Sequence, residues 1–250
     1  MAVSELPDTS IQTARFPEYL KADQDFEGKD SPFDLLSPAE MKRLTAGGYQ
    51  VFDTAVFPPV PIKGSIAERK LEDLQWADSD FAGMTVAEIG SQLGFFGFIA
   101  ASLGARQVIG VDINPRFVAE ANKFAVHFKR MCNWHDDKVM FRTQLIEVGV
   151  PLPEKPDIIV ANSIVHWFII QNANHSIDDI LCWLRDNCNF AVYFEGCVTA
   201  SEKIMQDHGI PLQRYSEERF LAACERLFSR VEIVGRCSYN NQRIVARLYK

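Results

Sequence analysis

The chain has 250 residues, of which 47% are hydrophobic and 24% charged, and its formal net charge is −7. This composition is typical of a globular protein with enough chain to bury a sizeable core. The acidic balance argues against a large nucleic-acid substrate, which usually requires a basic face, and no apolar run is long enough to cross a bilayer.

The six cysteines form no Cys-x-x-Cys pair, so we expect neither a zinc site nor a disulfide framework. Reduced thiols in a cytoplasmic protein are the simplest account of them. The first residues lack a basic region followed by an apolar stretch, so we expect no secretory signal peptide.

Residues 1–84 are predicted to form an N-terminal extension, partly helical and partly irregular. Ser37, followed by Pro and then Glu, caps a predicted helix that ends at Gly47. The proline-rich run 58–61 predicts an extended stretch, and a further helix is predicted over 66–74. This extension is a candidate lid over a binding site, although packing on the core is an equal alternative.

A short apolar run and a glycine turn follow the extension. Val86–Ile89 is too brief for a helix and suits a buried strand. Glycines follow at 90, 94 and 97, and the apolar segment 95–103 predicts a helix that ends before Gly104. The sequence therefore predicts a strand, a tight turn and a helix.

A second strand, Gln107–Val111, stops on Asp112. Such a unit is typical of nucleoside-binding proteins, because glycines let the backbone approach the ligand and a carboxylate ending the second strand accepts hydrogen bonds from ribose hydroxyls. Gln92 stands where a dinucleotide fingerprint would have its middle glycine. Glu88, two places before Gly90, would repel a pyrophosphate and suits a ligand with an ammonium group.

At Glu88, Gly90, Gly94 and Asp112 the stretch resembles the class I S-adenosylmethionine-dependent methyltransferases. Gln92 departs from the commonest form of their first motif. The alternative is an ordinary βαβ unit with a glycine turn and no ligand. The two acids at Glu88 and Asp112, with their spacing, disfavour it.

The remaining elements are predicted from periodicity and capping residues. The predicted helices are 114–130, a helical stretch at 164–168, 176–186 and 216–228, and the predicted strands are 138–143, 156–163, 189–195, 230–235 and 243–249. The resemblance implies an α/β fold, a three-layer αβα sandwich with a mostly parallel seven-stranded sheet whose last strand is antiparallel. Residues 85–250 would be the S-adenosylmethionine-binding core.

The resemblance also implies a cofactor site. Asp112 would hold the ribose, Gln144 and Leu145 would lie against the adenine, and Asn162 near the methionine end. Arg69 is a candidate for the methionine carboxylate. The full predicted set of cofactor-binding residues is Arg69, Glu88, Gly90, Ser91, Gly94, Asp112, Ile113, Gln144, Leu145 and Asn162.

Methyl transfer from a sulfonium is an in-line displacement that needs orientation and exclusion of water, and no metal. A base helps where the acceptor is a hydroxyl or a protonated amine. His166 is the candidate, since it follows the fourth strand and its usual pKa suits neutral pH; packing beneath the cofactor is the alternative. Glu195 is predicted either to touch the substrate or to pair with an arginine.

The sequence thus favours a methyltransferase that acts on a small molecule. Three alternatives stay open: a tRNA-modifying methyltransferase, a catalytically silent partner protein of the same fold, and a nicotinamide-dependent oxidoreductase. Gln92 and Glu88 disfavour the last of these.

Overall fold

The computed structural model describes residues 50, 52–172 and 174–250 of the chain. Residues 49–250 form one compact unit, so the segment between residue 50 and the first core strand belongs to the same unit as the sheet. The helix predicted between Ser37 and Gly47 lies outside the described residues.

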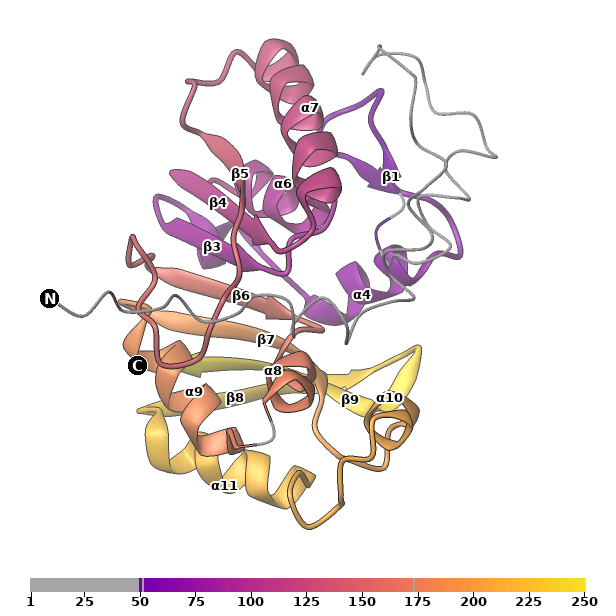
Figure 1. Cartoon of the computed structure of the whole chain (residues 1–250). Coiled ribbons are helices and arrows are strands. Elements are labelled where there is room, and N and C mark those ends of the chain that lie inside the picture. Colours follow the sequence, from indigo (N-terminus) through magenta and orange to yellow (C-terminus); the bar gives the residue numbers. More distant parts are fainter. Residues whose placement is uncertain (1–49, 51, 173) are drawn as a thin grey trace, which may run out of the picture. The chain divides into compact units, whose positions relative to one another are not determined.

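A seven-stranded sheet runs through this unit, in the order β5-β4-β3-β6-β7-β9-β8 (Figure 1). The first five strands in that order are parallel, and β9 pairs antiparallel with both β7 and β8. The strands are β3 Thr85–Ile89, β4 Gln107–Asp112, β5 Val139–Thr143, β6 Ile158–Asn162, β7 Ala191–Cys197, β8 Arg230–Cys237 and β9 Asn240–Tyr249. The predicted sheet, with its last strand inserted antiparallel, is confirmed.

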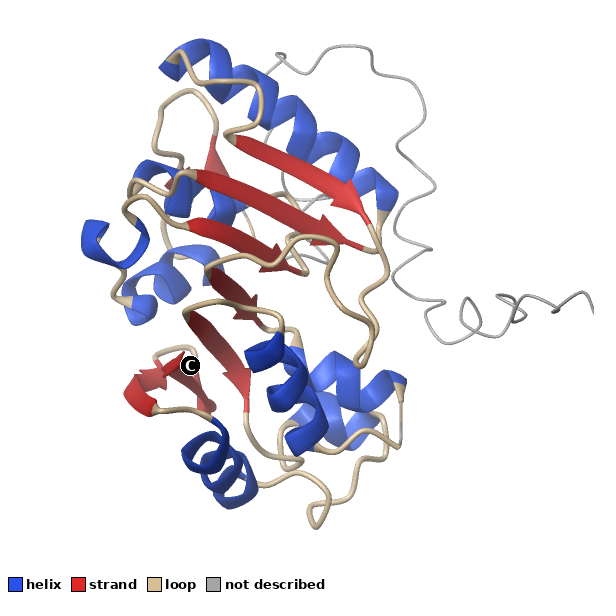
Figure 2. Ribbon diagram, turned by 90° about the vertical axis from the view of Figure 1, so that its left-hand side faces the viewer, coloured by secondary structure: helices blue, strands red, loops and turns tan. Residues whose placement is uncertain are grey.

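Helices cover both faces of the sheet (Figure 2). One buried cluster joins the sheet to α4 (Ile66–Leu74), α6 (Phe95–Ser102) and α7 (Pro115–Cys132). The other cluster joins the opposite face to α8 (Val165–Gln171), α9 (Ile177–Asp186) and α11 (Glu217–Leu227). The predicted three-layer arrangement is therefore confirmed.

Capping side chains explain where several helices begin. The Asn114 side chain accepts from the Arg116 N–H at 3.0 Å, and Ser176 and Ser216 cap α9 and α11 in the same way at 3.2 and 3.3 Å. These hydrogen bonds satisfy amide groups that have no partner inside the helix.

Several short elements were not predicted. They are β1 Phe52–Asp53, β2 Val60–Pro61, α5 Asp78–Phe81 and α10 Lys203–Asp207. Elements of two to five residues carry too few periodic positions to be recognised from a sequence. The connection from β5 to β6 is also unusual, because residues 144–157 cross between two parallel strands without a helix.

No helix among the described residues combines the length and apolar character needed to span a bilayer. In the same part of the chain, no three His, Cys, Asp or Glu side chains are arranged to hold a metal ion.

Candidate functional site

The candidate site lies at the carboxyl edge of the parallel strands, where open α/β sheets bind their ligands. Ser91 follows β3, while Asp112 and Asn162 end β4 and β6. Glu195 on β7 is the register partner of Asn162. The topology thus gathers polar residues from four neighbouring strands at one edge, although they are up to about a hundred positions apart in the sequence.

The turn after β3 is built on three left-handed residues. Gly90, Gln92 and Gly94 have φ values of 72°, 46° and 82°. The N–H groups of Gly90 and Ser91 both donate to the Val111 carbonyl, at 2.8 and 3.0 Å, so the turn is attached directly to β4. Gln92 therefore adopts the conformation for which a glycine would be preferred.

Glycine is needed at 94 for space as well as for conformation. A Cβ there would lie 2.2 Å from the ring of Phe141, and a Cβ on Gly90 would lie 2.9 Å from the Ile164 side chain. The backbone of the turn therefore lies against its neighbours without room for a side chain.

Glu88 lies beneath the turn and is only 2% exposed. Its Oε2 accepts a hydrogen bond from the Gly97 N–H at 2.9 Å, in the first turn of α6. Burial raises the pKa of Glu88 well above its usual range, against the opposing effect of that hydrogen bond. This hydrogen bond joins β3 to the first turn of α6. Glu88 therefore stabilises the two elements that flank the glycine turn.

The Asp112 carboxylate accepts hydrogen bonds from the backbone N–H groups of Gln92, at 2.9 Å, and Asn114, at 2.8 Å. Burial raises the pKa of Asp112, and the backbone hydrogen bonds from Asn114 and Gln92 oppose that rise. A carboxylate has about four lone-pair sites, so acceptor capacity remains beyond its backbone hydrogen bonds.

Three buried side chains along this edge carry polar atoms without a hydrogen-bond partner in the described part of the chain: the Ser91 hydroxyl, the Asn162 amide and both ring nitrogens of His166. They are 0%, 9% and 1% exposed. Buried polar groups are normally paired. Their position at one edge of the sheet makes this edge a candidate site for a polar ligand.

No family model matches the chain. Sequence relatives include the ribosomal protein L11 methyltransferase of Actinobacillus pleuropneumoniae serotype 5b, 44% identical over 91 residues, which are 36% of this chain and 28% of the relative. The enzyme of the same name from Clostridium perfringens strain SM101 is 28% identical over 139 residues, 56% of this chain and 38% of the relative. The chain therefore spans less than half the length of these relatives.

Solved structures extend the similarity to about three quarters of the chain. Magnesium protoporphyrin IX methyltransferase from Synechocystis PCC 6803, solved with bound SAH, aligns with a TM-score of 0.52 at 16% identity, over 74% of this chain and 84% of that one. The N-methyltransferase NodS from Bradyrhizobium japonicum WM9 aligns with a TM-score of 0.51 at 16% identity, over 74% and 95%. The chain has the class I S-adenosylmethionine-dependent methyltransferase fold.

The remaining predicted cofactor residues of this methyltransferase fold lie on the outer side of the edge. Ile113 and Leu145 are 55% and 37% exposed. Gln144 is half-buried, and its N–H donates to the Asp112 carbonyl at 2.9 Å. Ile113 and Leu145 are exposed apolar side chains near Asp112, and such side chains can cover an adenine ring. Their contact with adenine stays a prediction.

Arg69 is exposed on α4, and its contact with the methionine carboxylate stays a prediction. The next residue on α4, Lys70, is only 1% exposed and reaches Glu195 at the carboxyl edge of the sheet. Successive helical residues point about 100° apart, so this side chain faces the sheet. Its Nζ lies 2.6 Å from Oε2 of Glu195.

Arg243 and Glu202 are two further residues of this edge that the sequence did not predict. Arg243 lies on β9 and pairs with Glu195 at 3.7 Å and with Glu202 at 2.6 Å, and all three are buried. Burial raises the pKa of Glu195, but the neighbouring Lys70 and Arg243 lower it to about 2. The predicted pairing of Glu195 with an arginine is thus present.

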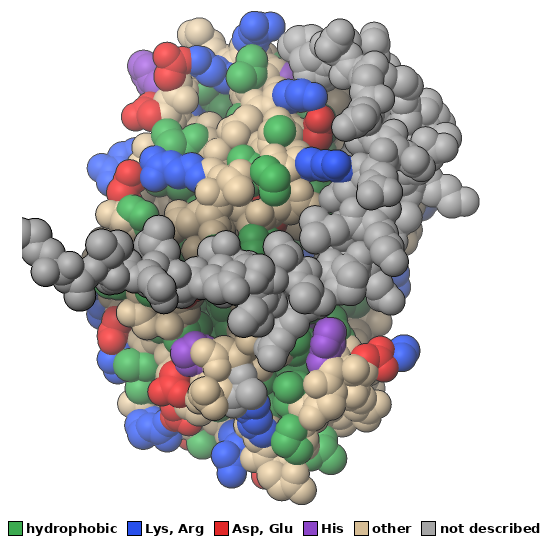
Figure 3. Space-filling model, viewed as in Figure 1, with side chains coloured by type: hydrophobic (Ala, Val, Ile, Leu, Met, Phe, Trp, Pro, Cys, Tyr) green, Lys and Arg blue, Asp and Glu red, His purple; other side chains and the backbone are tan. Residues whose placement is uncertain are grey.

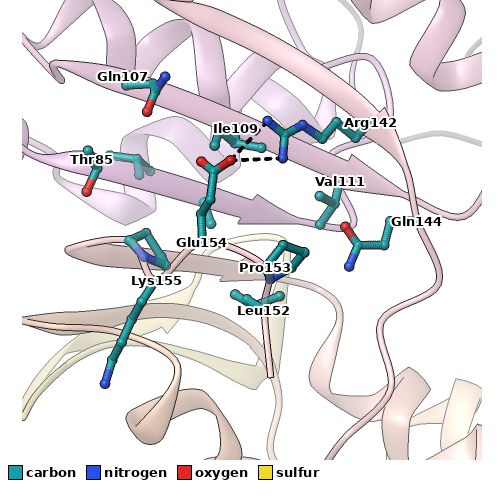
Figure 4. A pocket seen from close by; sticks show the side chains of 13 residues that line it. Thr85, Gln107, Ile109, Val111, Arg142, Gln144, Leu152, Pro153, Glu154 and Lys155 are labelled. Carbon is teal, nitrogen blue, oxygen red and sulfur yellow. Dashed lines mark hydrogen bonds and ion pairs between the residues drawn. The ribbon is translucent and has the colours of Figure 1, made fainter. Parts of the chain in front are cut away.

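A small pocket elsewhere on this methyltransferase fold lies against β3 and β4, beside the irregular β5–β6 connection (Figure 4). Its cavity of about 80 Å³ is well below the roughly 300–1,000 Å³ of ordinary ligand pockets. Thr85 and Gln107, which begin their strands, line it, and Arg142 and Glu154 pair at its rim at 3.3 Å. Gln144, a predicted adenine contact, also lines the pocket, together with Val111. The pocket therefore reaches the end of β4 near Asp112, but we assign it no role in cofactor binding because its volume is too small for a nucleoside.

Proposed function

We propose that the chain is a methyltransferase that binds S-adenosylmethionine at the ends of β3 and β4 and a small-molecule acceptor beside β6 and β7. The observation that carries the proposal is the set of unpartnered buried polar groups on Ser91, Asn162 and His166, in line with the Asp112 carboxylate. When bound, S-adenosylmethionine supplies a methyl group already activated by its positive sulfur.

Different residues along the edge are proposed to bind different parts of the cofactor. The Asp112 carboxylate would accept hydrogen bonds from the ribose, while Ser91 and Asn162 would meet the polar methionine end. The glycine turn gives the ligand access to the backbone because Gly90 and Gly94 have no side chain. Orientation and exclusion of water are the main contributions that such a transfer requires from a protein.

His166 is proposed to contact the acceptor. Burial, reinforced by Arg243, lowers its pKa to about 3, so the ring is neutral at pH 7 and a weaker base than the usual histidine pKa predicted. A neutral ring can still accept a hydrogen bond from the acceptor and orient it. Glu195 cannot replace it, because its carboxylate is already paired with Lys70 and Arg243. If His166 is the base, His166→Ala should reduce turnover roughly a hundredfold or more.

A protein acceptor is the second candidate, because the sequence relatives are named for methylation of a ribosomal protein. The RNA alternative finds less support. On the face that Figure 3 shows, Lys and Arg side chains of the described residues are interspersed with Asp and Glu and form no basic patch.

Isothermal titration with S-adenosylmethionine and S-adenosylhomocysteine, with NAD as control, tests the proposal. Micromolar binding of the first two and none of NAD supports it, and failure to bind either contradicts it. Release of S-adenosylhomocysteine would then be compared between a panel of small phenols, acids and amines and a purified ribosomal protein, which separates the two acceptor classes.

A further inference from the structure

Ser163, the residue directly after β6, has an unusual backbone conformation. Its φ is 54°, in the left-handed region that side chains with a Cβ rarely adopt. Its N–H donates to the Glu195 carbonyl at 2.6 Å. A non-glycine residue stays in this region only where its surroundings enforce it, and such residues are concentrated at functional sites.

Three buried side chains converge on the Ser163 hydroxyl. Lys70 Nζ and Arg243 Nη1 each donate to Oγ at 2.7 Å, and Oγ donates to Glu195 Oε2 at 2.9 Å. A serine hydroxyl has one donor and two acceptor positions. All of them are used, so this hydroxyl serves the structure and is not available to a substrate.

Ion pairs hold these partners in place. Glu195 lies 2.6 Å from Lys70 and 3.7 Å from Arg243, and Arg243 pairs with Glu202 at 2.6 Å. The Tyr239 hydroxyl also donates to Glu195. The charges of Lys70, Arg243, Glu195 and Glu202 balance, with two cations and two carboxylates.

The position of Ser163 gives this arrangement a consequence. It stands between Asn162 and the start of α8, which carries His166, and these neighbours carry the unpartnered polar groups of the edge. The φ of residue 163 therefore sets the direction in which the chain leaves β6, and with it the placement of His166 relative to Asn162.

We propose that Lys70, Glu195 and Arg243 are positioning residues that hold Ser163 in the left-handed conformation and thereby orient Asn162 and His166 toward the ligand. Because Lys70 lies on α4, its ion pair with Glu195 also fixes this helix beside the site. The inference rests on the proposed function only for the identity of the ligand.

The test compares Ser163→Gly with Ser163→Ala in the full chain. Both substitutions remove the hydroxyl, but only glycine adopts positive φ without a steric penalty. The probe is S-adenosylhomocysteine, titrated calorimetrically, and melting curves confirm that each variant is folded. We expect the glycine variant to bind about fivefold or more tightly than the alanine variant, because alanine depopulates the binding-competent backbone.

The variant Glu195→Gln removes the charge that joins the two cations. It should weaken S-adenosylhomocysteine binding, and adding Ser163→Gly to it should restore at least part of the loss. Equal affinities of the glycine and alanine variants would overturn the proposal, and so would a glycine substitution that restores nothing.

The ¹⁵N resonances of the His166 ring provide a second readout that needs no ligand. They should move in Ser163→Ala and lie closer to wild type in Ser163→Gly; equal shifts in both variants would overturn the proposal. If the wild-type chain binds neither S-adenosylmethionine nor S-adenosylhomocysteine, the proposed function fails, and these resonances still decide the role of Ser163.

Discussion

The carboxylate of Asp112 accepts a hydrogen bond from the backbone N–H of Gln92, with an N···O distance of 2.9 Å. The acid that ends β4 is thereby joined to the turn that follows β3. Because the contact is made by the backbone, the turn does not depend on the side chain at position 92. A glutamine is accommodated there at a φ of 46°.

Replacing Asp112 by alanine should weaken S-adenosylmethionine binding by about thirtyfold or more, since charge-assisted hydrogen bonds contribute about 1.5–3 kcal/mol each. Calorimetric titration measures this change. Asp137, which is exposed and outside the site, provides the control Asp137→Ala. Unchanged affinity in the Asp112 variant would remove this residue from the proposed ribose contact.

Gln92→Gly should leave the free energy of unfolding unchanged or raise it by up to about 1.5 kcal/mol. The substitution relieves left-handed strain of about 1–2 kcal/mol and costs about 0.5–1 kcal/mol of chain entropy. Gln92→Val should be destabilising, because a β-branched residue tolerates positive φ poorly. Urea denaturation of the two variants gives the comparison, and a more stable valine variant would contradict it.

Most of the sheet and the first part of the site were predictable because their signals are local. The predicted helix over residues 66–74 coincides with α4, and the strand ending at Asp112 and the helix after Asn114 lie where periodicity and capping put them. Each depends on neighbours within a few positions. The glycine turn is equally local, since its spacing alone indicates a tight connection.

The group around Glu195 could not be predicted in this way. Lys70 and Arg243 lie 125 and 48 positions from it, as their numbers show, and meet it only because α4 and β9 converge on one edge. A single sequence contains no signal for such long-range pairs. Lys70 could not be recognised from the sequence, because the rotation of α4, which decides which of its side chains face the sheet, depends on how this helix packs.

Gly94→Ala should destabilise the protein more than Gly149→Ala. Both glycines have positive φ, 82° and 97°, but a Cβ at 94 would lie 2.2 Å from the Phe141 ring, whereas nothing lies within 4 Å at 149. The difference therefore isolates overpacking, which costs about 1–3 kcal/mol. Equal midpoints in urea for the two variants would show that the Phe141 ring moves aside freely.

Glu88→Gln should stabilise the protein relative to wild type, and this difference should grow as the pH rises. Burial raises the pKa of Glu88 well above the 4.5 of a free glutamate, so the folded state keeps a proton that the unfolded chain releases. The free energy of unfolding of the wild-type protein then falls as the pH rises from the pKa of Glu88 in the unfolded chain to its raised pKa in the folded protein. Glutamine is neutral throughout, and its oxygen can still accept from the Gly97 N–H. The melting temperature of the variant relative to wild type should increase from pH 5 to pH 8, while the exposed Glu218→Gln serves as control.

His166 should remain neutral from pH 8 down to about pH 5. Burial, with Arg243, lowers its pKa from 6.5 to about 3, so the unfolded chain takes up a proton below pH 6.5 that the folded protein does not. Stability that is complete above pH 6.5 is then lost as the pH falls toward 3, by up to about 1.4 kcal/mol per pH unit. The His166 ring resonances should not titrate between pH 8 and 5, and His166→Gln should reduce the acid slope in urea unfolding. A ring that titrates near pH 6.5 would show that it is solvated, and would remove the physical basis for placing it in a closed acceptor site.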